Sequence, residues 1–372
     1  MYDLNQQLRF MLVELEPMGT NTETILKNLE EVELLVKTYG GRVYAATAQK
    51  SHYRNRSKSL GAGKAEEVAD AIAKEKIDIV VINDLVSPGQ LYSLEKIFCR
   101  ANQKIKVWDR MDLILNIFAL HAHTKEAKLQ IDLARLRHMG PRTFGMGYIL
   151  SRQGGGIGTV GVGETNTELM KRHWRNEMRR ISEELERLLV ERKKQIEKRK
   201  NIGFLTVSLV GYTNSGKTTL FNLLTKKENY VSDNLFATLD SAVGKIEMAG
   251  KHRDIVVSDT IGFIKNLPPS LIETFKSTLM ESINADLLLI VVDVSDSEFA
   301  DKLLVVDGIL NELKLEDKKR IYVFNKADKL DSSYRMDLEK QYFQISPLFI
   351  SAKSGDGIDV LFNRIGQTFN SK

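Results

Sequence analysis

GYTNSGKT, residues 211–218, matches the pattern G-x-x-x-x-G-K-[ST] between the apolar stretch FLTVSLVG and a helical pattern. A strand, a glycine-rich turn and a helix, in that order, are the context in which this motif is meaningful. Glycines let backbone N–H groups close around phosphate oxygens, and the helix N-terminus favours an anion. The stretch therefore predicts a phosphate-binding loop (P-loop) at the carboxyl edge of an α/β sheet.

The chain around this loop alternates strand and helix patterns from residue 201 to residue 372. We expect strands at 204–211, 242–250, 254–260, 287–294, 321–326 and 348–353. Helical patterns separate most of these apolar runs. The alternation predicts an open, mixed but mostly parallel sheet with helices on both faces, of the Ras-like P-loop type.

The first part of the chain predicts a second, smaller α/β domain and a helical hairpin. Apolar runs at 9–16, 42–49, 78–85 and 105–110 are separated by helical patterns, which indicates a small parallel sheet within residues 1–115. Residues 116–200 lack strand signals. Two amphipathic helices there flank the stretch SRQGGGIGTVGVGET, so we expect an antiparallel hairpin with a glycine-rich tip. A 4-3-4-3 seam marks the second helix: Trp174, Met178, Ile181, Leu185 and Leu188.

Charge is distributed unevenly along the chain. The net charge is +5, but residues 124–200 hold 18 Lys and Arg against 10 Asp and Glu. The predicted hairpin thus carries +8 and the remainder −3. One interpretation is a polyanionic partner for the hairpin; the other is an ordinary solvated helix face.

Composition excludes several classes of protein. Apolar runs such as DLLLIVVDV are strand-sized, well below the roughly 18 to 20 residues of a membrane span. The N-terminus MYDLNQQLRF does not have the pattern of a signal peptide. A single cysteine, Cys99, permits no internal disulfide and fits a reducing compartment. We expect a cytoplasmic monomer without a membrane span.

The P-loop residues have distinct expected roles in binding a nucleotide. Lys217 should reach the β- and γ-phosphates, and the Thr218 hydroxyl should bind Mg²⁺. Backbone and side chains of the whole loop should surround the phosphates: Gly211, Tyr212, Thr213, Asn214, Ser215, Gly216, Lys217, Thr218 and Thr219.

Two later motifs identify the base as guanine. NKAD follows the strand pattern IYVF, and its Asp328 carboxylate can accept from guanine N1–H and the 2-amino group, a donor pair that adenine lacks. SAK follows the last strand pattern and should bring a backbone N–H near guanine O6. The expected base-side residues are Asn325, Lys326, Asp328, Ser351, Ala352 and Lys353.

The motif DTIG, at the end of another strand, predicts the γ-phosphate sensor. Asp259 should hold Mg²⁺ directly or through water, and the Gly262 N–H should bond the γ-phosphate. Thr260 and Ile261, between them, are expected to belong to the nucleotide site as well. Thr238 is a candidate second protein ligand of Mg²⁺, or else an ordinary loop threonine. We expect Lys217, Thr238 and Gly262 to serve catalysis.

These motifs resemble the HflX family of translational GTPases over nearly the full chain. GYTNSGKTTLFN, DTIGFIKNLP and NKAD are similar to its G domain, and WDRMDLILNIFA, AKLQIDLARL and GGGIGTVGVGET to its upstream part. The resemblance implies GTP and GDP binding, Mg²⁺-dependent hydrolysis, and a 50S ribosomal partner reached by the tip near the peptidyl-transferase region. Val160 and Val162 stand where the family usually has Arg and Pro.

Phe263 replaces the glutamine that orients the attacking water in Ras-type enzymes. Its side chain cannot form a hydrogen bond, so we expect slow intrinsic hydrolysis that the ribosome stimulates. Asn214 is either a ligand of an activating K⁺, as in potassium-activated GTPases that this domain resembles, or a residue that only hydrogen-bonds the loop. The alternative to an enzyme is a GTP-binding ribosome-associated module that acts by occupancy.

Overall fold

The computed structural model describes residues 7–51, 60–153, 162–227, 235–236, 242–246, 254–268, 271, 274–275 and 279–370. At 141–153, 162–167 and 370 the structure describes the backbone alone. The chain divides into two compact units. The first comprises Met1–Leu120 and Lys128–Leu185, and the second His121–Ala127 and Glu186–Lys372.

A four-stranded parallel sheet of order β2-β1-β3-β4 forms the centre of the first unit, as the sequence predicts. Its strands are β1 (Arg9–Pro17), β2 (Arg42–Ser51), β3 (Ile79–Ile82) and β4 (Lys106–Asp109). Its crossover helices are α1 (Thr22–Tyr39), α2 (Ala62–Glu75) and α3 (Pro88–Phe98). The four residues of β3 are all buried, because helices cover both faces of such a sheet.

Local capping fixes where these helices begin and end. The Asn21 side chain accepts the Thr24 N–H at 2.7 Å at the start of α1, and Gly40 ends that helix in the left-handed region, at a φ of 94°. A reciprocal capping box between Ser87 and Gln90 begins α3. Local side chains and one glycine therefore set both ends of α1 and the start of α3.

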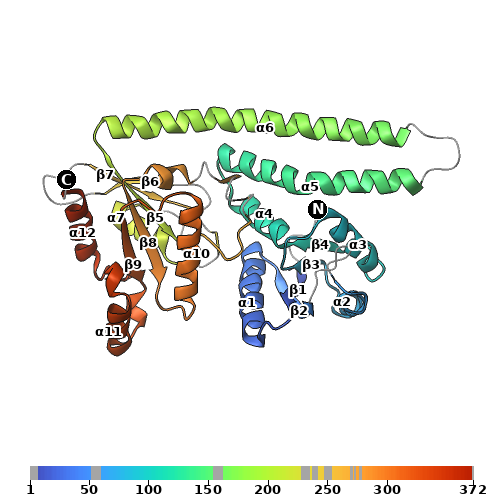
Figure 1. The fold of residues 1–372 in the computed structure, drawn as a ribbon, viewed down its shortest axis with the longest axis horizontal. Coiled ribbons are helices and arrows are strands. Elements are labelled where there is room, and N and C mark those ends of the chain that lie inside the picture. The colour runs from blue at the N-terminus through green and yellow to red at the C-terminus, as the bar shows by residue number, and fades with distance from the viewer. Residues whose placement is uncertain are drawn as a thin grey trace. The chain divides into compact units, whose positions relative to one another are not determined.

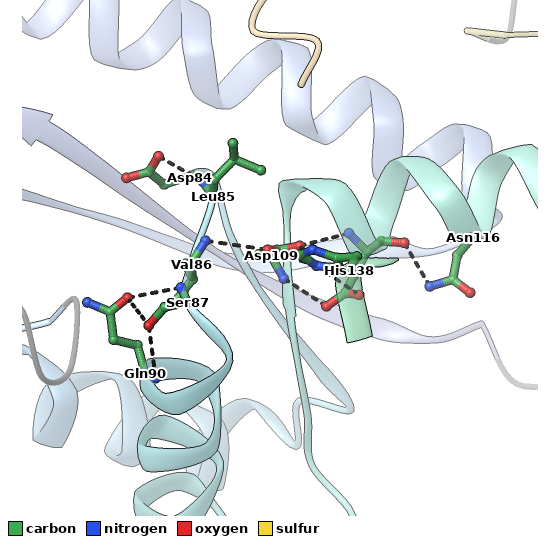
Figure 2. Close-up of polar contacts among 9 residues, drawn as sticks. Asp84, Leu85, Val86, Ser87, Gln90, Asp109, Asn116 and His138 are labelled. Atoms are coloured by element: carbon green, nitrogen blue, oxygen red, sulfur yellow. Dashed lines mark hydrogen bonds and ion pairs between the residues drawn. The ribbon is translucent and has the colours of Figure 1, made fainter. Parts of the chain in front are cut away.

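An Asp-Asp-His cluster joins β4 to the helices that follow it (Figure 2). Asp109 Oδ1 accepts the Asp112 N–H at 2.8 Å, and Asp112 Oδ2 accepts the Asp109 N–H at 3.3 Å. His138 Nε2 lies 3.1 Å from Asp109 Oδ1. The two carboxylates thus cap α4 (Arg110–His121), and the histidine attaches α5 (Lys125–Gln153) to that cap.

The predicted helical hairpin is present. In Figure 1, α5 and α6 (Val162–Asn201) run in opposite directions. Along the α6 seam, Ile181 and Leu185 are buried and Trp174, Met178 and Leu188 are half-buried. Leu129 and Leu133 of α5 are buried as well. The 4-3 spacing therefore reports helix packing, and the charged residues between the seam positions face outward.

The second unit is built on a six-stranded sheet of order β10-β9-β8-β5-β7-β6. Within it β6 is antiparallel, paired with β7, and the other pairs are parallel, so the sheet is mixed and mostly parallel as predicted. Its strands are β5 (Leu205–Gly211), β6 (Ala242–Ile246), β7 (Ile255–Asp259), β8 (Leu287–Asp293), β9 (Arg320–Asn325) and β10 (Leu348–Phe349).

Helices cover this sheet on both faces (Figure 1). Alternate residues of β5 and β8 pack with α7 (Lys217–Thr225) and α12 (Ile358–Asn370) in one core. On the opposite face, Phe299 of α10 (Phe299–Glu312) packs against Phe324, whose ring also meets Tyr342 beside α11 (Ser332–Gln341). Because the central strands are parallel, their carboxyl ends share one edge, where P-loop, Asp259, Asp293 and Asn325 all lie.

A buried ion cluster attaches the end of α6 to this unit. Glu281, on α9 (Met280–Asn284), is 7% exposed and accepts from Arg199 Nη2 at 2.7 and 2.9 Å. Arg192 donates to both carboxylate oxygens of Glu126 at 3.0 Å. These arginines, two helical turns apart, are therefore structural residues of α6.

A second buried carboxyl lies in the small sheet. Glu14 of β1 is 2% exposed, and its Oε2 accepts from Asn83 Nδ2 at 2.6 Å. Burial raises the pKa of Glu14 to about 7, against the hydrogen bond from Asn83 and the charge of Arg110. Between pH 4.5 and 7 the folded state holds this proton more tightly than the unfolded chain. The free energy of unfolding must therefore fall as the pH rises through that window.

We predict that Glu14→Gln removes this dependence. From pH 5 to pH 8 the wild-type first unit should lose about 2 kcal/mol of unfolding free energy relative to the variant. Both tryptophans, Trp108 and Trp174, lie in the first unit, so urea unfolding followed by tryptophan fluorescence reports on it. Parallel pH profiles of wild type and variant would contradict the assignment.

Candidate nucleotide site

The P-loop folds as its sequence predicts, between β5 and α7. Gly216 adopts a φ of 90°, and a Cβ there would lie 2.2 Å from Asn325 Nδ2. Asn214 also has a positive φ, 60°, which asparagine tolerates better than most residues. The turn therefore needs glycine at position 216 for both conformation and space.

The NKAD motif, predicted to read the base, holds the P-loop from one side. Asn325 donates from Nδ2 to the Ser215 carbonyl at 2.8 Å and accepts the Ala352 N–H on Oδ1 at 2.9 Å. Lys326 donates to the Asn214 carbonyl at 3.0 Å and pairs with Asp293 Oδ2 at 2.6 Å. P-loop, NKAD and SAK are thus brought into one hydrogen-bonded cluster.

Lys217 is buried within the loop that it serves. Its Nζ donates to the carbonyls of Gly211 at 3.2 Å and Tyr212 at 2.7 Å. Burial lowers the pKa of Lys217 to about 8, although the charge of Asp259 acts in the opposite direction. An anionic phosphate beside this ammonium would favour its charged form.

Thr218 and Asp259, both predicted Mg²⁺ ligands, meet at the same edge. The Thr218 hydroxyl donates to Asp259 Oδ2 at 2.8 Å, and Asp259 is fully buried. Magnesium binds oxygen at about 2.0–2.1 Å in octahedral geometry, so adjacent ligands lie about 2.9 Å apart. The spacing and chemistry of the two oxygens fit Mg²⁺. Thr238, the other predicted ligand, lies outside the described residues.

Gly262, the predicted γ-phosphate sensor, passes close to the P-loop. A Cβ at this position would lie 2.8 Å from Thr213 Cα and 3.0 Å from Lys217 Nζ. Only glycine allows this approach. Thr260 and Ile261 are buried, and the Thr260 hydroxyl donates to the Leu209 carbonyl at 2.7 Å. Their side chains therefore support the segment from the core.

The Phe263 ring belongs to the core, since the residue is 1% exposed. Its backbone pairs with the P-loop: the Thr213 N–H donates to the Phe263 carbonyl at 2.8 Å, and the Phe263 N–H to the Gly211 carbonyl at 3.1 Å. A residue with this placement holds the chain in position and offers no polar group to a water molecule.

The residues predicted to bind the base differ in exposure. Asp328, in the 3-10 turn Ala327–Lys329, is exposed, as is Lys353, whereas Ser351 is 1% exposed. Thr219 is half-buried in the first turn of α7. A groove of about 410 Å³ adjoins Asp328 and Ser351. Arg335 and Phe349, with a guanidinium-to-ring distance of 5.0 Å, also line it; sequence patterns gave no sign of them.

This sheet, with its P-loop, the buried Asp259 at the same edge and the NKAD loop, defines a P-loop GTPase domain. A family model described as "50S ribosome-binding GTPase" matches residues 206–326. Models described as "GTP-binding GTPase N-terminal" and "GTP-binding GTPase Middle Region" match residues 26–119 and 121–199.

Several curated relatives are named "GTPase HflX". The chain is 40% identical to "GTPase HflX" of Caldanaerobacter subterraneus over 342 residues, 91% of this chain and 76% of the relative. It is 36% identical to "GTPase HflX" of Escherichia coli over 348 residues, 93% and 80% of the two chains. The chain therefore belongs to the HflX family of GTPases.

A solved structure supports the same fold. The crystal structure of SsGBP in a complex with GDP aligns with a TM-score of 0.52 and 27% identity, covering 96% of this chain and 98% of that one. No helix among the described residues is long and apolar enough to cross a membrane.

We predict that Asp328→Asn changes base selectivity. The carboxamide would lose the charged acceptor for guanine N1–H and the 2-amino group, and it would pair better with the keto group of xanthine. GTP affinity should fall about 10- to 100-fold while affinity for xanthosine triphosphate rises, as measured by nucleotide titration.

Asp331→Asn is the matched control. It makes the same chemical change three residues further along the chain, at an N-cap where asparagine serves as well as aspartate. It should leave both affinities unchanged. Unaltered GTP binding in Asp328→Asn would mean that NKAD does not read the base.

Proposed function

We propose that this GTPase binds the large ribosomal subunit through its helical hairpin, within residues 116–200, and that ribosome binding stimulates GTP hydrolysis. The observation that carries the proposal is a group of exposed arginines on α6: Arg172, Arg175, Arg179 and Arg180. Ribosomal RNA is a polyanion, and arginine contacts to phosphate give salt-dependent affinity. The description of the family model that matches the G domain supports the same partner.

The roles of the site residues belong to this proposal. Lys217 and the P-loop would hold the phosphates of GTP or GDP, Asp328 would read guanine, and Thr218, Asp259 and Thr238 would hold Mg²⁺. Bound Mg²⁺ would neutralise charge that develops on the phosphates. Gly262 would sense the γ-phosphate. A ribosomal partner would place the protein, monomeric when free, in the cytoplasm.

The glycine-rich tip, with Val160 and Val162, is proposed to lie towards the peptidyl-transferase region of the 50S subunit. Val160 lies outside the described residues, and Val162 is described only as backbone in the first turn of α6. Splitting of stalled or idle ribosomes would be the consequence of such binding.

The alternative function is action by occupancy, in which the protein binds GTP and the ribosome but hydrolyses GTP negligibly. On that alternative, added ribosomal subunits should leave the rate of phosphate release unchanged.

We predict that changing Arg172, Arg175, Arg179 and Arg180 together to Gln weakens binding to 50S subunits. Log affinity falls as log salt rises, and the magnitude of this slope should decrease by roughly 0.7 to 0.9 for each phosphate that the variant no longer neutralises. GTP affinity in solution and thermal stability should remain unchanged, because exposed charges contribute little to folding. Cosedimentation with isolated subunits across a salt series measures the effect.

A control variant carries the same charge change elsewhere. Lys314, Lys319, Lys340 and Arg364 are exposed on the second unit, and replacing all four by Gln also removes four positive charges. The hairpin variant alone should bind more weakly. If the two variants behave alike, only net charge matters and the hairpin is not the binding surface.

Potassium activation is the second element of the proposed mechanism. Asn214 is exposed, and its carbonyl is held by Lys326 while its side chain lies at the phosphate loop. A K⁺ held by this side chain would supply a positive charge beside the phosphates, as an arginine finger does. On the other interpretation Asn214 serves only the turn.

We predict that hydrolysis is faster in K⁺ than in Na⁺ at equal ionic strength, and that Asn214→Gly removes the difference while GTP still binds. Glycine is a better replacement than alanine, because position 214 has a φ of 60°, which would strain the backbone of alanine. Phosphate release in the two salts, with GTP affinity determined in parallel, provides the measurement. Equal wild-type rates would refute potassium activation.

A further inference from the structure

The P-loop strand continues past β5 and pairs with the segment that follows β7. Tyr212 and Phe263 form an isolated parallel bridge through the two backbone hydrogen bonds of Phe263. Between the last β5–β7 pair and this bridge, three residues (260–262) stand opposite two (210–211) of the P-loop strand. The segment after β7 therefore has one extra residue, and within it Gly262 lies so close to the P-loop that a Cβ would be 3.0 Å from Lys217 Nζ.

A side chain of the P-loop adds a third contact to this segment. The Tyr212 hydroxyl accepts the N–H of Lys265 at 2.7 Å, two residues beyond the bridge. Directly after it, Asn266 has a φ of 51°, so the chain turns away at this point. Tyr212 thus contacts both ends of residues 263–265: its backbone pairs with Phe263, and its hydroxyl bonds Lys265.

The Tyr212 ring is fixed by its surroundings. The residue is 8% exposed, and the Lys302 ammonium lies 5.4 Å from the ring centroid. Lys302 pairs with Asp296 at 2.5 Å and with Glu298 at 3.9 Å, and Glu298 also pairs with Lys265 at 3.5 Å. The hydroxyl therefore meets the Lys265 N–H within a network that connects both partners to α10.

These contacts determine where Gly262 lies. The Thr260 hydroxyl is bonded to the Leu209 carbonyl on one side, and Phe263 is paired with the P-loop on the other. Only Ile261 and Gly262 span the interval, and Gly262 lies against Lys217. If residues 263–265 leave the P-loop, Gly262 loses one of its two anchors.

We propose that Tyr212 is a positioning residue for GTP hydrolysis. Its hydroxyl keeps residues 263–265 docked on the P-loop, so that the Gly262 amide stays beside Lys217 where the γ-phosphate binds. The side chain at 263 is apolar and buried, so the placement of the backbone has to perform what a polar side chain performs in other GTPases. Tyr212 supplies part of that placement.

Tyr212→Phe tests the proposal, because it removes the hydroxyl and keeps the ring. Intrinsic kcat should fall about twofold to tenfold, the range expected for one hydrogen bond. Affinity for a non-hydrolysable GTP analogue should fall by a similar factor. Affinity for GDP should remain unchanged, since GDP has no γ-phosphate for Gly262 to contact. The ratio of the two affinities is a readout that a general loss of stability would not move.

Tyr322→Phe is the matched control, because it makes the same chemical change on β9, where the Tyr322 hydroxyl interacts with the carboxyl of Asp307. It should leave the affinity ratio and kcat at wild-type values. An unchanged ratio in Tyr212→Phe, or an equal loss of GDP and analogue binding, would overturn the positioning role. So would the same change in the control. None of these outcomes bears on the ribosomal partner, which the hairpin variant tests separately.

Discussion

Two hydrogen bonds of one side chain, Asn325, hold the nucleotide site together. Its amide donates to Ser215 of the P-loop and accepts from Ala352 of the SAK loop, so two segments distant in sequence share one partner in NKAD. Gly216 has to be glycine because this amide occupies the space of a Cβ. The parallel order of β5, β8 and β9 makes the arrangement possible, since it brings the carboxyl ends of those strands to one edge.

That edge concentrates charge in a region from which water is largely excluded. Lys217 and Asp259 are both buried, and loss of water around the ammonium lowers the pKa of Lys217 to about 8, although the charge of Asp259 acts in the opposite direction. The phosphates of a nucleotide would add negative charge beside the ammonium, and a metal ion would add positive charge beside the carboxylate. Nucleotide binding should therefore stabilise the folded G domain by more than the contacts of the base alone would provide.

The sequence predicted what depends on local pattern and missed what depends on long-range contact. Strand and helix periodicity located both sheets and the hairpin seam, and the motifs located Lys217, Asp259 and Asn325 at strand ends. The hydrogen bond of the Tyr212 hydroxyl could not be predicted, because its partner Lys265 lies 53 residues away. Lys265 also donates from its backbone N–H, which every residue except proline has, so the residue type gives no signal. The pairing of His138 with Asp109, and of Arg199 with Glu281, could not be read from sequence either, because the partners lie 29 and 82 residues apart. Thr260 was assigned to the nucleotide by its motif, yet its hydroxyl bonds the Leu209 carbonyl in the core.

The arginines of the hairpin fall into two groups that differ in burial and in their partners. Arg192 and Arg199 are three-quarters or more buried as side chains and are committed to Glu126 and Glu281, so they can contribute little to an external polyanion. Arg172, Arg175, Arg179 and Arg180 are exposed, and the ion pairs that Arg179 and Arg180 make, with Glu183 and Glu177, are on the helix surface, where exchange for phosphate costs little. One helix thus carries arginines that build the G-domain unit near its C-terminal end and arginines available to a partner nearer its N-terminal end. Net charge alone could not distinguish them, because the distinction lies in which carboxylates the fold brings to each side chain.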